Sequence, residues 1–221
     1  MHTTFRRTLL LGTLLAALMQ AAPAGAAQNL GGCQLDGLAT LTPGLTLNQG
    51  TPLDWGPAFT YSFHGDLLDC VGVFGQEYPG GGAAGSIHAG EALTIEGTEY
   101  EWPAALGTPS GNGGCTGSHT DGTALIVWAH GTFSVIDYST EGAAAGIGLT
   151  GQFGSETVTL ASKAKNADGT PVSTRTIEAT DLAGNYAGGP LVFHPEDPTQ
   201  CNGSGVTEAP ITGFLGHGNY A

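Results

Sequence analysis

The amino-acid sequence predicts an all-β protein: an antiparallel β-sandwich or flattened β-barrel of about nine short strands, stapled by disulfides. Segments rich in β-branched and aromatic residues recur between turn signals along the chain. The 38 glycines interrupt the pattern often, and no amphipathic helix of the kind that alternates with strands in α/β proteins is evident. The four cysteines, an even number, favour cross-links within such a scaffold.

The N-terminal segment has the anatomy of a signal peptide. Arg6-Arg7 precede the apolar run Leu9 to Met19, and Ala24-Gly25-Ala26 has the small-x-small form of a cleavage site. The run is shorter than the ~20 residues that a membrane-spanning helix needs. We therefore expect residues 1–27 to be removed and residues 28–221 to form one all-β domain, secreted or held in the cell envelope. The arginine pair also fits a twin-arginine export signal, although the leucine-rich run favours the ordinary route.

The mature chain is strongly acidic. Two of the five basic residues lie in the signal and all 19 acidic residues lie after it, which gives 3 − 19 = −16. This charge repels nucleic-acid phosphates and anionic lipid, so we predict no nucleic-acid partner. Apart from the cluster Glu96, Glu99 and Glu101, the acids are scattered, as expected of a solvated surface. No mature segment is apolar over enough residues to predict a membrane span.

The cysteines predict two disulfides, because an even count in an oxidising compartment is normally paired. No zinc site is predicted, because the cysteines show no C-x-x-C spacing and have no histidine pair near them in the sequence. The four are Cys33, Cys70, Cys115 and Cys201. Three pairings are open; we favour Cys33–Cys70 with Cys115–Cys201, because the first pair flanks the opening strands and the second flanks the remainder. Leu30-Gly31-Gly32-Cys33 also has a likeness to a lipobox, which would make Cys33 a lipidated N-terminus and leave an odd thiol; this is the minority alternative.

The first part of the mature chain predicts two strands. From Cys33 to Leu41 small or apolar residues alternate with polar ones, and Thr42-Pro43-Gly44 ends the strand as a turn. Phe59, Tyr61 and Phe63 alternate with polar residues in the clearest period-2 segment of the chain, which continues towards Cys70. This predicts a strand with an aromatic inner face.

The next part is interrupted by glycine and proline. Ser86 to Glu96 is predicted to be one strand with a bulge at Gly90-Glu91. Gly97 to Gly114 contains Trp102-Pro103, Thr108-Pro109 and Gly111-Asn112-Gly113-Gly114, which predict largely irregular structure.

The longest apolar run of the mature chain predicts a central β-hairpin. Thr123 to Trp128 and Phe133 to Tyr138 are rich in β-branched and aromatic residues, and His130-Gly131 supply a two-residue turn. That turn places Trp128 opposite Phe133 and Leu125 opposite Ile136. Both faces of the hairpin are then apolar, which indicates that it is covered from two sides.

The remaining elements are shorter strands. Asp168-Gly169 is a strong turn signal, so the segments on either side of it predict a second hairpin. The predicted segments are Ala143 to Phe153, the hairpin Thr157 to Ser162 with Val172 to Ala179, Pro190 to His194, and Val206 to Leu215.

The order of these features points to a resemblance. It lies in Cys33…Gly37-Leu38-Ala39-Thr40-Leu41-Thr42-Pro43-Gly44-Leu45, in Tyr61…Gly65…Cys70, in Gly122 to Trp128, and in Cys201…Gly205-Val206-Thr207. The chain resembles a group of small exported bacterial all-β proteins with a similar cysteine pattern and no assigned activity. The likeness covers nearly the whole mature chain and rests on turns, cysteines and strand starts. It implies an exported all-β domain and brings no catalytic residue with it.

No catalytic constellation is evident in the sequence. The G-x-S-x-G elbow of serine hydrolases does not occur. The carboxylates Glu96, Glu99, Glu101 and Asp69 are the candidates for glycan hydrolysis, which needs two carboxyl groups facing each other across a cleft. The six mature histidines show no metal-ligand spacing; we predict no metal and no cofactor, although calcium is the ion best suited to the carboxylates.

These observations predict an exported, non-enzymatic β domain that acts by binding or as an envelope or extracellular structural component. An exported glycan-directed hydrolase is one alternative. Another is a barrel that holds a small apolar ligand, which requires a closed sheet with a hollow interior. The partner is unknown; the loop aromatics Trp55, Tyr78, Trp102 and Tyr186 either stack on a glycan or protein or, as we favour, fold back onto the core.

Overall fold

The computed structural model describes residues 28–47, 56–72, 85–129, 131–143 and 145–219. Strands dominate these residues, and the two helical pieces are short 3-10 turns. No helix within the described ranges has the length and apolarity to cross a membrane. The strands are β1 (Gln28–Leu45), β2 (Ala58–Gly72), β3 (Gly85–Ala89), β4 (Leu93–Ile95), β5 (Thr98–Tyr100), β6 (Ser110–Gly114), β7 (Gly117–Trp128), β8 (Phe133–Ala143), β9 (Gly146–Phe153), β10 (Glu156–Ala161), β11 (Thr174–Ala179), β12 (Tyr186–Phe193) and β13 (Val206–Asn219); the 3-10 turns are η2 (Ala104–Leu106) and η3 (Pro198–Asn202).

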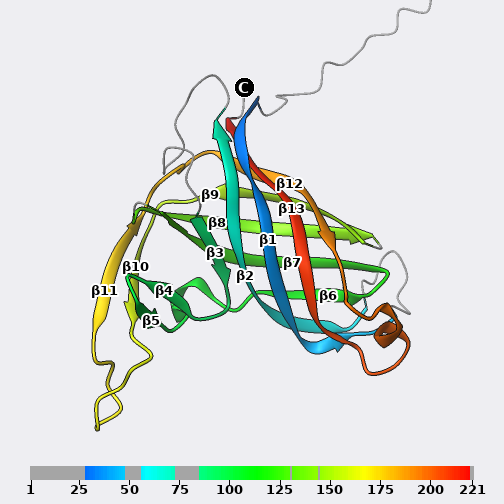
Figure 1. The fold of residues 1–221 in the computed structure, drawn as a ribbon, viewed down its shortest axis with the longest axis horizontal. Coiled ribbons are helices and arrows are strands. Elements are labelled where there is room, and N and C mark those ends of the chain that lie inside the picture. Colours follow the sequence, from blue (N-terminus) through cyan, green and yellow to red (C-terminus); the bar gives the residue numbers. More distant parts are fainter. Residues whose placement is uncertain (1–27, 48–55, 73–84, 130, 144, 220–221) are drawn as a thin grey trace, which may run out of the picture.

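Eight strands close into an antiparallel barrel, which confirms the predicted fold class. Around the barrel the order is β8-β9-β12-β13-β1-β2-β3-β7, and the β7–β8 pairing closes the ring. β3 and β6 occupy the same place in the strand order. Each of them pairs with both β2 and β7, at different heights along the barrel. In Figure 1, β1, β2 and β13 cross in front of β7, β8 and β9 at a steep angle, so the barrel is flattened.

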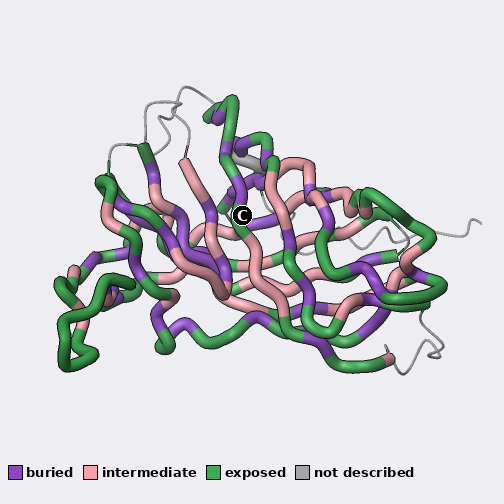
Figure 2. Tube along the Cα trace, turned by 60° about the horizontal axis from the view of Figure 1, so that its bottom comes forward, coloured by how far each residue is buried: buried purple, intermediate pink, exposed green. Residues whose placement is uncertain are grey.

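Alternating side chains divide the barrel wall into an inner and an outer face. On β1, Cys33, Leu35, Ala39 and Leu41 are buried, while the polar residues between them are exposed. This confirms the predicted alternation on β1, and Figure 2 shows short buried stretches interspersed with half-buried and exposed ones along the chain. The predicted end of this strand at Thr42-Pro43-Gly44 was wrong. β1 continues to Leu45, because a register shift against β13 accommodates the turn residues within the strand.

The central hairpin is covered from both sides, as predicted. The inner face of β7 and β8 joins the barrel core, whereas Leu125, Phe133 and Val135 on the outer face belong to a second apolar cluster. That second cluster is completed by residues of two hairpins, β4–β5 and β10–β11, and of η2: Leu93, Ile95, Tyr100, Leu106, Val158, Leu160, Ile177 and Ala179. The two hairpins lie together at one side of the barrel in Figure 1.

The register of the β7–β8 hairpin differs by one residue from the prediction. Val127 pairs with Phe133 and Leu125 with Val135. The connection has three residues, 129–131: the Gly131 amide donates to the Trp128 carbonyl, and Gly131 has φ +81. A turn followed by a left-handed glycine adds one residue to the loop, which the two-residue turn prediction did not allow for. His130, to which the prediction gave a turn role, lies outside the described residues.

The chain leaves the barrel wall at Gly90, where the sequence predicted a bulge within one strand. Gly90 has φ +71, and β3 and β4 are separate strands on either side of it. Glu96 and Gly97, both at positive φ, form the turn of the small β4–β5 hairpin. The predicted irregular stretch Gly97 to Gly114 was also wrong in part, since it contains β5 and β6.

Ion pairs fasten the two outer hairpins to each other at the surface. The cluster Glu96, Glu99 and Glu101 pairs one to one with the three Lys and Arg residues that follow residue 27. The pairs are Arg175–Glu96 at 3.0 Å, Lys163–Glu99 at 2.6 Å and Lys165–Glu101 at 2.9 Å. All six side chains are partly or largely exposed, so each pair is worth about 0–1 kcal/mol and the apolar cluster beneath them dominates.

The two disulfides have the favoured connectivity. Cys33 on β1 is bonded to Cys70 on the neighbouring strand β2. Cys115, between β6 and β7, is bonded to Cys201 in η3. The first links two paired strands, and the second ties the β6–β7 turn to a segment far along the chain.

Candidate functional site: a cavity in the barrel

The interior of the barrel is packed over part of its length and hollow over the rest. A cavity of about 110 Å³ lies between the two crossing walls. An engineered apolar cavity of roughly 150 Å³ holds a benzene molecule, so this space suits a compound of about one small ring. The interior therefore offers a site for a small molecule.

The lining of the cavity is mainly apolar. Every wall of the barrel contributes, so the cavity depends on ring closure and on no single hairpin. The aliphatic and aromatic side chains come from all eight strands of the ring: Leu35, Ala39, Leu41 and Leu45 (β1), Phe59 and Phe63 (β2), Ile87 (β3), Ala124 (β7), Ile136 (β8), Ile147 and Leu149 (β9), Leu191 and Phe193 (β12), and Ile211 and Leu215 (β13). Such a lining favours an apolar ligand over water.

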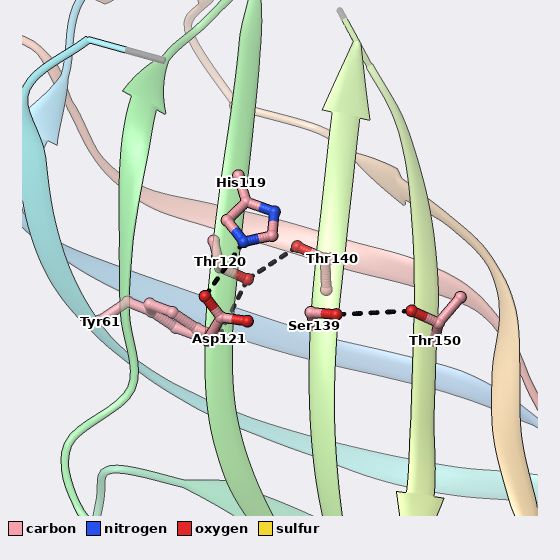
Figure 3. A network of polar contacts seen from close by, with 7 residues as sticks. All are labelled: Tyr61, His119, Thr120, Asp121, Ser139, Thr140 and Thr150. Atoms are coloured by element: carbon pink, nitrogen blue, oxygen red, sulfur yellow. Dashed lines mark hydrogen bonds and ion pairs between the residues drawn. The ribbon is translucent and has the colours of Figure 1, made fainter. Parts of the chain in front are cut away.

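Four hydroxyl groups form a chain on the cavity wall. Tyr61 of β2 and Tyr138 of β8 meet with their phenol oxygens 2.7 Å apart. The Tyr61 hydroxyl donates to Thr120 Oγ1 at 3.2 Å, and Thr120 Oγ1 is 2.7 Å from Thr140 Oγ1. Figure 3 shows Thr120 and Thr140 facing each other across β7 and β8, with Tyr61 nearby. All four residues line the cavity, so this chain and the separate hydroxyl of Ser118 are the polar side chains of its wall.

Burial keeps both phenols neutral. Desolvation is the largest cause that raises the pKa of Tyr61, and its hydrogen bonds to Thr120 and Tyr138 offset part of this rise. Desolvation also raises the pKa of Tyr138 well above 10.0, and the neighbouring Tyr61 adds to that shift. The hydroxyl chain therefore presents uncharged donors and acceptors to the cavity at neutral pH.

We expect Tyr61 and Tyr138 to ionise only above the ordinary tyrosine pKa of 10.0. Because the folded-state pKa values are raised, the neutral pair stabilises the fold fully below that pH, and this contribution is lost as the pH rises through the raised values. Tyrosinate absorbance followed during alkaline titration, in parallel with circular dichroism, measures both effects. The double variant Tyr61→Phe/Tyr138→Phe should lose the late-titrating absorbance. If this double variant instead loses only tyrosinate absorbance that appears near the ordinary tyrosine pKa, the expectation is contradicted.

The hollow part of the barrel reaches a glycine-rich end. Gly114 and Gly117 at the β6–β7 turn and Gly142 near the end of β8 line the cavity there, together with Ser118. A Cβ added at Gly142 would come within 3.2 Å of the Oγ of Ser118, its partner on the neighbouring strand β7, so a larger residue here would press on that side chain. The Cys115–Cys201 disulfide holds the same end, and Cys115 itself lines the cavity.

The opposite end of the barrel is filled. Leu67, Ile126 and Trp128 are all at most 2% exposed and pack in the same cluster as the Cys33–Cys70 disulfide. The Trp128 indole donates to Ser134 Oγ at 2.9 Å, and Ser134 in turn donates to the carbonyl of Asp181 at 2.8 Å. The observed register, which differs by one residue from the predicted one, makes this contact possible because it brings Ser134 beside Trp128. The packed half supplies a floor to the cavity.

The outer face of the same strands carries a separate polar surface. His119 Nε2 is 3.1 Å from Asp121 Oδ2 on β7, and Ser139 of β8 lies 3.5 Å from Thr150 of β9. Figure 3 shows these side chains on neighbouring strands. Asp121 is 67% exposed, so this surface is open to solvent and does not share the low-dielectric surroundings of the cavity.

The carboxylates considered from the sequence do not converge, whereas two of the histidines, His64 and His88, lie opposite each other on β2 and β3. His64 pairs with Glu91 at 2.9 Å, and His88 Nε2 lies 3.0 Å from Ser86 Oγ. Burial lowers the pKa of His88 and that of His217. Among the described residues no group of three or more His, Cys, Asp or Glu side chains is placed to hold a metal ion. Glu96, Glu99 and Glu101 each face a basic side chain instead of one another.

Two of the four loop aromatics considered from the sequence lie within the described residues. Trp102 packs against the outer apolar cluster, and its indole donates to the Gly107 carbonyl at 2.6 Å, as expected of an aromatic that folds back. Tyr186 begins β12, and its ring lies over Gly188, where any Cβ would overlap it. Trp55 and Tyr78 lie outside the described residues.

The hydroxyl chain was not predicted from the sequence. Periodicity put Tyr61 on an inner face and Tyr138 at the end of a central strand, but no pattern gave a role to Thr120 or Thr140. Tyr61 and Tyr138 are 77 residues apart and meet only because the barrel closes. The available signal was the alternation itself, which puts Tyr61 and Tyr138 on apolar inner faces where a hydroxyl needs a partner.

A scan against protein-family models, a search of curated proteins and a search of solved structures found no match to this chain. The chemistry of the cavity therefore carries the functional conclusion.

Proposed function

We propose that this protein is an exported binding protein that holds one small, mainly apolar molecule inside its barrel. The observation that carries the proposal is the lumen cavity of about 110 Å³, whose apolar wall is interrupted by a single hydroxyl chain. Small-molecule sites commonly combine an apolar lining with a few placed polar groups. A hollow interior is what a ligand-holding barrel, one of the functions predicted from the sequence, requires.

Several features support binding as the role. The phenols that line the cavity have raised pKa values, so they stay protonated and uncharged at neutral pH and supply no anionic base for catalysis. The packed floor and the disulfide at the glycine-rich end give the cavity fixed walls. Two disulfides and the signal-like segment before residue 28 support export to an oxidising compartment.

Fluorobenzene, a small apolar probe, tests the proposal directly. We expect saturable binding by ¹⁹F NMR, because burial of the ring in the cavity removes its apolar surface from water. Ala124 lines the cavity, so Ala124→Leu should fill part of the space and weaken binding by about tenfold or more.

Ala167→Leu is the matched control, since it makes the same change at an exposed loop position. It should leave fluorobenzene binding unchanged. No saturable binding by the wild-type protein, or equal binding by the Ala124→Leu and Ala167→Leu proteins, would contradict the proposal.

A further inference from the structure

The hydroxyl chain contains one more proton than its internal hydrogen bonds use. Tyr138, Tyr61, Thr120 and Thr140 carry one hydroxyl proton each, and three links join them. Each link consumes one proton. One donor is therefore left over for a group outside the chain.

The direction of one link fixes the two ends. Tyr61 donates its only hydroxyl proton to Thr120, so the Tyr61–Tyr138 bond has to be donated by Tyr138. The Tyr138 oxygen then has acceptor capacity and no proton to give. The spare proton belongs to the threonine pair, on Thr120 or Thr140. The cavity wall thus offers an acceptor at the Tyr138 end and a donor at the threonine end.

The cavity provides nothing to balance a negative charge. Its lining contains no lysine, arginine or histidine. The mature chain has only three Lys and Arg residues in total, and all three are ion-paired on the outer hairpins. A carboxylate in the lumen would lose its hydration without a cationic partner, at a cost that greatly exceeds one neutral hydrogen bond. The raised pKa values of Tyr61 and Tyr138 show the same resistance to negative charge.

We infer that the ligand is a neutral alcohol or phenol of about one ring, whose hydroxyl donates to Tyr138 Oη while its hydrocarbon part fills the apolar cavity. This inference rests on the proposed function and specifies its ligand class. A hydroxyl group fits because it supplies the donor that the Tyr138 end needs, and its oxygen can also accept from a neighbouring donor. Carboxylates of the same size are excluded.

Four probes of similar ring size separate these possibilities by ¹⁹F NMR titration at neutral pH. 4-Fluorophenol carries a neutral hydroxyl, 4-fluoroanisole keeps the oxygen without its proton, fluorobenzene lacks the oxygen, and 4-fluorobenzoate is an anion. We expect 4-fluorophenol to bind about two- to tenfold more tightly than 4-fluoroanisole, the worth of one hydrogen bond. Binding of 4-fluorobenzoate should be undetectable.

The double variant Tyr61→Phe/Tyr138→Phe is the variant of choice, because in Tyr138→Phe alone the Tyr61 oxygen would become the accepting end of the chain. Only the threonine pair, the donor end of the chain, then remains, so this variant should lose most of the preference for 4-fluorophenol over 4-fluoroanisole and still bind fluorobenzene. Tyr186→Phe removes a phenol hydroxyl on a residue that does not line the cavity, and it should keep the wild-type preference.

The outcomes separate the inference from the proposed function. Equal binding of 4-fluorophenol and 4-fluoroanisole by the wild-type protein, or binding of 4-fluorobenzoate, overturns the inference while fluorobenzene binding upholds the cavity. A preference that survives undiminished in a folded double variant also overturns it. If fluorobenzene and the other probes all fail to bind, the proposed function fails and the inference with it. If the double variant does not fold, the wild-type comparison of the four probes decides the outcome alone.

Discussion

Replacing Cys115 and Cys201 together by alanine should lower the free energy of unfolding by about 4 to 5 kcal/mol. The disulfide closes a chain segment with a sequence separation of 86 residues, and cross-linking so long a loop strongly restricts the unfolded chain. The same bond also holds the β6–β7 turn to η3 at the glycine-rich end of the cavity. Chemical denaturation monitored by circular dichroism, without reductant, measures the change.

The Cys33→Ala/Cys70→Ala protein provides the comparison. Its disulfide has a sequence separation of 37 residues and joins strands that are already paired, so the expected loss is about 4 kcal/mol. Only the Cys115/Cys201 variant should also weaken fluorobenzene binding, because Cys115 lines the cavity and neither Cys33 nor Cys70 does. Unchanged stability in the Cys115/Cys201 variant would show that the disulfide does not restrain the unfolded chain.

Leu160→Ala should destabilise the protein by about 2 to 5 kcal/mol. Leu160 is fully buried in the second apolar cluster, between the β10–β11 hairpin and the outer face of β7 and β8. Its truncation removes apolar burial and leaves a cavity. A loss of this size would show that the outer hairpins are part of the cooperative fold. Denaturant unfolding followed by both circular dichroism and tryptophan fluorescence measures it.

Thr159→Ala is the matched control, because Thr159 precedes Leu160 on the same strand and points to solvent. It should change stability by no more than about 0.5 kcal/mol. Two separate unfolding transitions, with only the weaker one shifted by Leu160→Ala, would contradict a single cooperative unit and show an outer layer that melts independently of the barrel.

The parts of the fold that the sequence predicted are those encoded by side-chain alternation and by cysteine count. The inner aromatic face of β2, the apolar faces of β7 and β8 and the β10–β11 hairpin all follow from local patterns. The register of β7 and β8 did not, because a single left-handed glycine, Gly131, lengthens the turn by one residue.

The glycine-rich strand β6 shows why composition alone can mislead. Residues Gly111 to Gly114 read as irregular, yet they form a strand between β2 and β7. A Cβ at Gly111 would collide with the His119 carbonyl and the Phe59 ring, so close approach of the neighbours requires glycine here. Glycine in this strand marks crowding, whereas the sequence pattern suggested a loop.

The candidate site depended on information that no local pattern contains. The inner positions of Tyr61 and Tyr138 were predictable from periodicity, but their meeting required eight strands to close in one order. The volume of the cavity depends on the balance of large and small side chains around the whole ring. Ala39 and Ala124 leave space that larger residues at the same positions would fill.

The pairing of β1 with β13 has a consequence for the order of folding. These strands come from opposite ends of the described chain and are hydrogen-bonded along most of their length. The first strand therefore has a bare edge until the last one arrives, and ring formation has to wait for nearly the entire polypeptide. Contacts of such high sequence separation form slowly. While a chain emerges from its N-terminus, the sheet therefore stays open and does not close into a barrel.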